Sequence, residues 1–323
     1  MDEKADRLSK AEYEHRLMTK AVWYYYIENY TQQSISHLLG VSRSKVISLL
    51  ERARQADVIQ FSVQQDSSRR MEMERELLSR YGLRDAFIVP GASTLTDPNE
   101  SIAQAAAMYI LRRAADNAFI NIGYGDTISR IFRHLAASTQ APLNLVSLAG
   151  GMNYYLPHTN NGVTISNSNV FNARLYLIPS PLLLSSGTLR DSLRREPDVE
   201  EIFRMIPLAS MSVVGIGSMN DQATIVKNGI LNNNDLTFLK MQGAVGDVLS
   251  HFLDKNGRIV SHELEGRLMS TPVEQLRTLD NVIGAAGGPA KAEAILSVLR
   301  GGYLDVLITD EDTAQLLLDA PEP

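Results

Sequence analysis

Seven short apolar runs between residues 87 and 312 constrain the fold of this chain more than any other feature of its sequence. The runs are continuous rather than alternating, which indicates strands buried on both faces, as in a parallel sheet covered by helices. Most of them end in turns that contain glycine, and such sheets bind ligands at the carboxyl ends of their strands. We therefore expect an α/β domain with a mainly parallel sheet. The runs are residues 87–91, 118–125, 143–151, 173–181, 211–218, 281–288 and 305–312.

The composition permits a large packed core and excludes several kinds of chemistry. The chain has 323 residues, of which 44% are hydrophobic, so disorder is not expected. It has no cysteine, which excludes disulfides, cysteine-ligated zinc and thiol nucleophiles. Its six histidines lack the spacing of a metal site, so we expect neither a metal nor a cofactor. No apolar run is long enough for a membrane span and the charged start is unlike a signal peptide, so a cytoplasmic protein is expected.

Residues 31–50, with the sequence TQQSISHLLGVSRSKVISLL, predict a helix-turn-helix. Thr31 is placed to cap a helix over residues 32–39, and Gly40 permits the left-handed backbone of a tight turn. Ser42 then caps a second helix. The apolar positions expected to face a small core are Ile35, Leu38, Leu39, Val46, Leu49, Leu50 and Ala53.

The outward side of the second predicted helix is basic and rich in hydroxyl groups, as expected of a helix that enters the major groove of DNA. Residues 1–70 also carry a net charge of +2, against −8 for the remainder. The alternative is a generic helical hairpin with a solvated basic face. Arg43 and Lys45 are the leading candidates for base or phosphate contacts. The full set of predicted DNA contacts is Thr31, Gln32, Ser42, Arg43, Ser44, Lys45 and Ser48.

Two further segments belong to this amino-terminal part. Residues 16–30 are expected to form another helix, whose aromatic run at 23–26 either packs in the core or joins neighbouring heads in an oligomer. Residues 57–63, with the sequence DVIQFSV, are expected to form a strand or wing.

The polar segment QQDSSRR marks the boundary between the two parts of the chain, because it contains no large apolar residue. We therefore predict a helix-turn-helix domain at residues 1–63, a linker at 64–70, and an effector-binding and oligomerisation domain at 71–323. The helix that opens the second domain is expected to end at Gly82.

The segment FINIGYGDT, residues 119–127, has the pattern of a strand followed by an anion-binding loop. Gly123 and Gly125 free the backbone, and Thr127 offers a hydroxyl where a helix begins. The alternative is steric, since glycine turns close many αβ units without touching a ligand. Asp126 is unexpected here, because its carboxylate repels phosphate unless it caps the helix or accepts hydrogen bonds from sugar hydroxyls.

Two charged residues further along the chain have the same kind of setting. Asp247, in the segment GAVGDVLSHFLD, is expected at the start of a helix, either as a cap alone or as an acceptor for ligand hydroxyls. Lys291 follows a Gly-Gly-Pro turn in the first turn of a helix, where a lysine opposes the helix dipole and so indicates an anionic partner. The alternative for Lys291 is an ordinary exposed lysine.

These residues make a poor enzyme site. Catalysis on a sugar phosphate needs a positioned base, a metal or a covalent lysine, and no histidine accompanies the loops. A DNA-binding regulator that senses a phosphorylated sugar is the main hypothesis. A sugar-phosphate isomerase or deaminase with an accessory DNA-binding head is the second, and an oligomerisation adaptor is the third.

Taken together, the motifs resemble the SorC family of bacterial sugar-responsive transcription regulators. The helix-turn-helix segment is followed, in the family's order, by NIGYGDT, SLAGG, GIG, GAVGD, AGGPAKAEAI and LITDEDTA. The resemblance extends from about Arg16 to Leu318, and the order is far more specific than any single glycine loop.

The resemblance implies a helix-turn-helix head and a Rossmann-like effector domain, similar to glucosamine-6-phosphate deaminases and ribose-5-phosphate isomerases, that senses a phosphorylated sugar without converting it. Homotetramers are usual in the family. By the same resemblance, Asp247 takes sugar hydroxyls and Lys291 meets the phosphate. Many family members have a basic or uncharged residue where Asp126 stands. The residues that the resemblance assigns to the effector site are Gly123, Tyr124, Gly125, Asp126, Thr127, Gly150, Gly151, Asp247 and Lys291.

Overall fold

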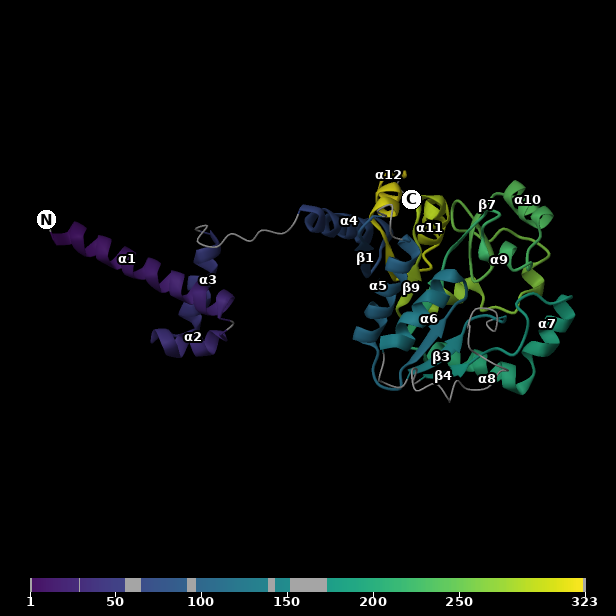
Figure 1. The fold of residues 1–323 in the computed structure, drawn as a ribbon, viewed down its shortest axis with the longest axis horizontal. Coiled ribbons are helices and arrows are strands. Elements are labelled where there is room, and N and C mark those ends of the chain that lie inside the picture. Colours follow the sequence, from purple (N-terminus) through teal and green to yellow (C-terminus); the bar gives the residue numbers. More distant parts are fainter. Residues whose placement is uncertain are drawn as a thin grey trace. The chain divides into compact units, whose positions relative to one another are not determined.

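The computed structural model describes residues 2–28, 30–55, 65–91, 97–138, 143–151 and 173–321. The chain divides into two compact units, Met1–Ser67, which we call the head, and Ser68–Pro323, which we call the α/β unit. Figure 1 shows the elements of each unit along the chain. None of the helices in the described ranges is long and apolar enough to cross a membrane.

The head is built from α1 (Asp2–Val22), a π-helical turn η1 (Trp23–Ile27), α2 (Gln32–Leu39) and α3 (Arg43–Gln55). The Thr31 hydroxyl accepts a hydrogen bond from the Ser34 amide at 3.1 Å, so α2 begins where the sequence predicts. Gly40 ends α2 with a left-handed φ of 64°. The Ser42 hydroxyl accepts from the Lys45 amide at 3.2 Å and caps α3 in the same way.

The core of the head differs from the prediction at two side chains. Met18, Ala21, Ile35 and the inward positions of α3 are buried together, whereas Leu38 is 55% exposed. Trp23 is also 55% exposed and donates from its indole N–H to Glu28 at 2.9 Å. Of the two alternatives for the aromatic run, packing in the core therefore does not hold for Trp23, whereas the next three tyrosines pack partly against the core of the head. The predicted strand or wing at 57–63 lies outside the described residues.

The α/β unit confirms the predicted sheet. Among the described residues, seven strands form one sheet in the order β1-β10-β9-β5-β2-β3-β4, and every neighbouring pair is parallel. Each apolar run of the sequence supplies one strand. The strands are β1 (Asp85–Val89), β2 (Phe119–Ile122), β3 (Leu143–Ser147), β4 (Ala173–Tyr176), β5 (Met211–Gly215), β9 (Val282–Ala285) and β10 (Val306–Asp310).

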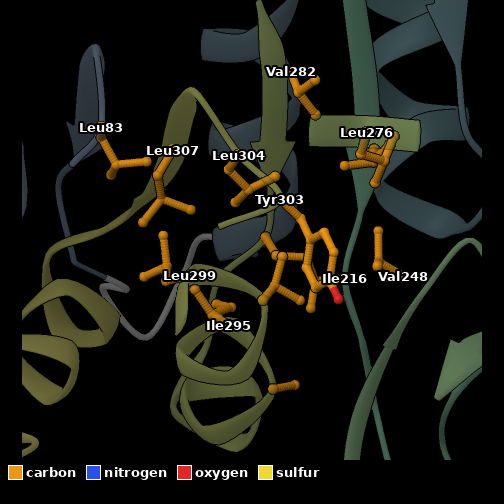
Figure 2. Close-up of a cluster of buried hydrophobic side chains, with 14 of the residues drawn as sticks. Leu83, Ile216, Val248, Leu276, Val282, Ile295, Leu299, Tyr303, Leu304 and Leu307 are labelled. Carbon is orange, nitrogen blue, oxygen red and sulfur yellow. The ribbon is translucent and has the colours of Figure 1, made fainter. Parts of the chain in front are cut away.

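Helices cover both faces of this sheet, which explains why its strands are apolar on both sides. On one face α5 and α6 pack in a core with β2, β3 and β5, and on the other α4, α11 and α12 pack on β1, β9 and β10 (Figure 1). Figure 2 shows the second core, where Ile295 and Leu299 of α11 meet Leu307 of β10. These helices are α4 (Gln65–Tyr81), α5 (Pro98–Arg113), α6 (Asp126–Ser138), α11 (Ala292–Arg300) and α12 (Glu311–Asp319).

The beginning of α4 differs from the expected linker. The helix begins at Gln65 rather than near Met71, so residues 65–70 are helical. Ser68, Arg69 and Arg70 are compatible with a helix, and a polar composition alone does not separate an exposed helical turn from a loop.

A second sheet, of three antiparallel strands among the described residues, corrects the prediction of a helix near Asp247. Its strands are β6 (Gly217–Ser218), β7 (Ala244–Val248) and β8 (His251–Asp254). Leu249 and Ser250 turn the chain between β7 and β8 with φ values of 53° and 67°. Gly246 lies so close to Ala294 that a β-carbon would collide with it, an approach that a glycine in a strand permits.

The remaining elements surround these sheets. The short helices α9 and α10 pack with β7 and β8 in a separate small core. They are α9 (Thr224–Lys227) and α10 (Asn233–Met241), with α7 (Gly187–Arg194), α8 (Pro197–Met205) and the 3-10 turns η4 (Ile206–Leu208), η5 (Glu265–Arg267), η6 (Val273–Thr278) and η7 (Pro289–Lys291) elsewhere in the unit.

Candidate functional site

A polar pocket of about 540 Å³ lies at the carboxyl ends of β2, β5 and β9. β2 continues to β3 on one side of the sheet, whereas β5 continues to β9 on the other, so the pocket lies at a topological switch point. Its walls are the loop after β2, the residues after β5, the Gly287–Gly288 turn after β9, and α9. The sheet topology therefore brings together segments that are far apart in the sequence.

Six of the predicted effector residues line this pocket, and three do not. Those that line it are Tyr124, Gly125, Asp126, Thr127, Asp247 and Lys291. The Gly123 amide donates to the Val213 carbonyl at 2.7 Å and extends the sheet instead.

The Gly150–Gly151 turn after β3 is not part of the pocket lining among the described residues. The Gly150 amide donates to the Met269 carbonyl and the Gly151 amide to the Ser180 carbonyl, each at 2.8 Å. A β-carbon at Gly150 would lie 2.6 Å from the Ser180 oxygen. The two glycines thus allow a close backbone approach, and their amides are already used within the protein.

Asp247 is the buried carboxylate of the pocket, with only 7% of its surface exposed. Its Oδ2 accepts a hydrogen bond from the Ser250 amide at 3.2 Å. Burial raises the pKa of Asp247 to about 6, although the Ser250 hydrogen bond and the charges of Lys291 and His251 act in the opposite direction. Gly217 lies against the carboxylate, and a β-carbon there would collide with Oδ1.

Lys291 stands at the N-cap of α11, where no side chain caps the helix. Burial lowers the pKa of Lys291, whereas the carboxylates of Asp247 and Asp126 act to raise it. Within the described part of the chain, its ammonium group has neither a hydrogen bond nor an ion pair closer than 4 Å. The pocket therefore contains a half-buried cation that has no direct partner among the described residues.

Asp126 is paired rather than free. It is the first residue of α6, and its Oδ2 accepts from Nε of Arg130 at 2.8 Å, one helical turn later. Arg130 also contacts Asp97 at 2.6 Å and Glu100 at 2.9 Å. This ion pair neutralises the charge that looked out of place in the sequence, and it leaves the Asp126 carboxylate only partly available to a ligand.

Several polar side chains of the pocket, including that of Arg130, were not predicted from the sequence. Arg130 comes from α6, Asn99 comes from the start of α5, and the others come from the segment between β6 and the residue that follows α9. A run of polar residues directly after a strand end is the signal that points to this segment. Its lining residues with polar side chains are Asn220, Gln222, Thr224, Lys227 and Asn228.

No set of three or more His, Asp or Glu side chains in the described ranges is arranged to hold a metal ion. The acidic and basic groups of the pocket are instead suited to a ligand that carries both an anionic group and hydroxyl groups.

The predicted DNA-contact residues of the head differ in whether their side chains are exposed or already paired within the protein. Arg43, Ser44 and Ser48 are exposed, and no described carboxylate lies within ion-pair distance of Arg43. Lys45 is different, because its Nζ contacts Oε1 of Glu14 at 2.7 Å. The hydroxyls of Thr31 and Ser42 cap helices, and Gln32 lines a shallow groove beside Arg43 and Tyr30.

A helix-turn-helix head and a parallel α/β unit with a polar pocket at a switch point define a transcription regulator that responds to a small ligand. Residues 65–319 match the family model described as "Putative sugar-binding domain". The chain belongs to the SorC family of sugar-responsive transcriptional regulators, and it is a regulator rather than an enzyme.

Two curated relatives support this assignment across both parts of the chain. The transcriptional regulator LsrR of Enterobacter sp. (strain 638) is 31% identical over 309 residues, which cover 94% of this chain and 93% of that protein. LsrR of Escherichia coli (strain K12) is 30% identical over 309 residues and covers 94% and 95% respectively.

Solved structures share the fold. The full-length sorbitol operon regulator SorC from Klebsiella pneumoniae is 24% identical, with a TM-score of 0.66 over 94% of this chain and 98% of that chain. The sugar-binding domain of the regulator DeoR from Pseudomonas syringae pv. tomato is 26% identical, with a TM-score of 0.55 over 76% of this chain and 97% of that chain.

Proposed function

We propose that this regulator binds operator DNA through α3 of its head, and that a phosphorylated sugar in the α/β unit changes its affinity for that DNA. The coupling is reciprocal, so DNA must alter the affinity for the sugar by the same factor. Control of a carbohydrate-utilisation operon in the cytoplasm is the role that fits such a sensor. The relatives named LsrR and sorbitol operon regulator support this kind of role.

The observation that carries the effector proposal is an ammonium group that has no direct ion pair among the described residues and lies near a buried carboxylate in one pocket. Lys291 attracts an anion, because it has no ion-pair partner among the described residues. Asp247 is an acceptor that is largely removed from water, and hydroxyl groups of a ligand would satisfy it. A phosphorylated sugar offers an anion at one end and hydroxyl groups along the rest of the molecule.

The start of α11 adds to the anion-binding character of this end of the pocket. A lysine at a helix N-terminus is unfavourable to the helix dipole, and α11 has no side-chain cap there. A phosphate near Lys291 would compensate both features, because backbone N–H groups at a helix start bind anions. We therefore place the phosphate by Lys291 and the sugar hydroxyls by Asp247.

The loop after β2 completes the proposed effector site. Tyr124, Gly125 and Thr127 form its wall, and Asp126 accepts from the ligand only with the oxygen that Arg130 leaves available. We propose that Gly123 and the Gly150–Gly151 turn serve the frame of the α/β unit instead of touching the sugar, because their amides already have protein partners.

For DNA, we propose that Arg43 makes the leading base contact, because it is exposed and lies in the first turn of α3. Ser44 and Ser48 lie on the exposed side of the same helix. Thr31, Gln32 and Ser42 are proposed to meet phosphates, as residues at helix starts commonly do. Lys45 is a phosphate contact only when it leaves Glu14.

The larger organisation of the molecule is part of the same proposal. We assign residues 1–63 to DNA binding, 64–70 to the connection, and 71–323 to effector binding and assembly. A homotetramer is the assembly that we propose from the resemblance of the sequence to the SorC family.

The test is fluorescence anisotropy of the labelled upstream region of this protein's own operon, titrated with a panel of sugar phosphates. At least one of them should change the DNA affinity and raise the thermal stability of the protein, since a ligand stabilises the state that binds it. Absence of DNA binding under every condition would contradict the proposed function.

Lys291→Met should raise the dissociation constant of the active sugar phosphate by about 100-fold, because a charge-assisted contact to phosphate is lost. Lys227→Met is the matched control, since Lys227 lines the same pocket but is exposed. The parent sugar without phosphate should bind weakly to both variants. If Lys227→Met abolishes binding and Lys291→Met does not, the phosphate lies at the α9 side of the pocket.

A further inference from the structure

A single carboxylate of α1 holds two cations of α3. Oε1 of Glu14 contacts Nζ of Lys45 at 2.7 Å, and Oε2 contacts Nη1 of Arg52 at 2.7 Å. Lys45 and Arg52 are seven residues apart, so they lie two turns apart on one side of α3. Arg43, only two residues before Lys45, has no such partner among the described residues.

These two ion pairs contribute little to the stability of the head, because they are exposed to solvent. The three side chains are between 34% and 50% exposed, and ion pairs in water contribute little to stability. The two cations do favour the ionised form of Glu14, because the hydrogen bonds and charges of Lys45 and Arg52 lower the pKa of its carboxyl group to about 2. Glu14 is therefore charged at every pH at which DNA is a duplex, and it competes directly with phosphate for both cations.

We propose that Glu14 is a specificity-determining residue, which withholds Lys45 and Arg52 from the DNA backbone while Arg43 remains available to read bases. This inference rests on the proposed DNA-binding function of α3. A cation that reaches a phosphate adds affinity for any sequence, because counterions are released. Occupation of two such cations by a carboxylate lowers the affinity for unrelated DNA, and so raises the ratio of specific to non-specific binding.

The test compares Glu14→Gln with the wild type on two duplexes of equal length, the upstream region and an unrelated sequence, across a series of salt concentrations. We expect Glu14→Gln to bind unrelated DNA about tenfold more tightly, with a plot of log affinity against log salt that is steeper by about 1 to 2. The ratio of specific to non-specific affinity should fall.

Glu12→Gln is the matched control, because it removes the same charge from the same helix, and within the described residues Glu12 pairs only with Arg16, at 3.2 Å. Glu12→Gln should leave the salt slope within about 0.3 of the wild type, since it frees no cation of α3. An equal effect of the two variants, with wild-type DNA binding intact, would show a general charge effect and overturn the inference alone. A wild type that binds neither duplex would overturn both proposals.

A second set of variants keeps the inference testable if Glu14→Gln fails to fold. The double variant Lys45→Gln, Arg52→Gln should bind unrelated DNA with nearly the wild-type salt slope, because these cations are already occupied by Glu14. A slope shallower by about 2 would mean that both cations contact phosphate in the wild type, and the inference would be wrong.

Discussion

α3 in the head and α11 in the α/β unit each have a lysine at or next to their first turn, and the two lysines differ in their partners. Lys45 of α3 forms a partly exposed ion pair with the Glu14 carboxylate at 2.7 Å, and the Ser42 hydroxyl caps the helix. Lys291 of α11 has no direct partner among the described residues, and its helix start is uncapped. Lys45 and the start of α3 are thus satisfied within the head, whereas we propose that a ligand satisfies Lys291 and the start of α11.

This contrast determines which conditions should affect each region. Exposed charges are screened by salt, so the head should respond mainly to ionic strength. Buried charges are screened little, and their cost depends on protonation, so the pocket should respond mainly to pH.

The largest expected effect concerns Asp247. Its pKa is about 6 in the folded protein and has an ordinary value of 3.8, so burial of the charged form costs about 3 kcal/mol. This cost is absent below pH 4, grows as the pH rises toward 6, and stays constant above it. Asp247→Asn should therefore raise the free energy of unfolding by up to about 3 kcal/mol at pH 8 and by almost nothing at pH 3.5, measured by urea unfolding followed by circular dichroism.

The control for this prediction is Asp126→Asn in the same pocket. Asp126 is exposed and paired with Arg130, so its loss should change the free energy of unfolding by less than about 1 kcal/mol. Asp247→Asn should also weaken binding of the sugar phosphate, since a carboxylate acceptor is lost. A pH-independent gain in stability would mean that folding does not shift the pKa of Asp247, and the contrast between the two regions would disappear.

A second and smaller effect concerns Arg43. Arg43→Ala should weaken binding of the upstream region by about 1–3 kcal/mol, because an exposed cation in the first turn of α3, the helix that we propose to contact DNA, is lost. The measurement is anisotropy at a fixed salt concentration, together with the affinity for unrelated DNA. Arg16→Ala is the control, because Arg16 pairs with Glu12 on α1. Equal losses for the two variants would remove Arg43 from the set of base contacts.

The features that the sequence predicted are those with a local cause. Each strand of the large sheet comes from a continuous apolar run, and such a run by itself indicates a strand that is buried on both faces. The helix-turn-helix could be predicted equally well, because Thr31, Gly40 and Ser42 act on backbone groups within a few residues of themselves. Leu38 and Trp23 were misplaced because exposure depends on what the rest of the head covers.

The features that the sequence could not predict depend on contacts between distant segments. Asp247 was expected at a helix start, yet Gly246 packs against Ala294 and the segment forms a hairpin. The Gly150–Gly151 turn has the composition of an anion loop, but its amides are used by the carbonyls of Ser180 and Met269. Only the fold reveals that Arg130 neutralises Asp126.

The smallest expected effect concerns the Ser42 cap at the start of α3. Ser42→Ala removes the hydroxyl that accepts from the Lys45 amide, so α3 should lose about 1 kcal/mol of stability. The chain has a single tryptophan, Trp23, so its fluorescence during thermal unfolding reports on the head within the full-length protein. Ser48→Ala, an exposed change in the middle of α3, should leave the unfolding temperature of the head unchanged or slightly raised. If Ser42→Ala behaves like Ser48→Ala, the start of α3 does not depend on its cap, and an uncapped start at α11 is no longer evidence for an anion there.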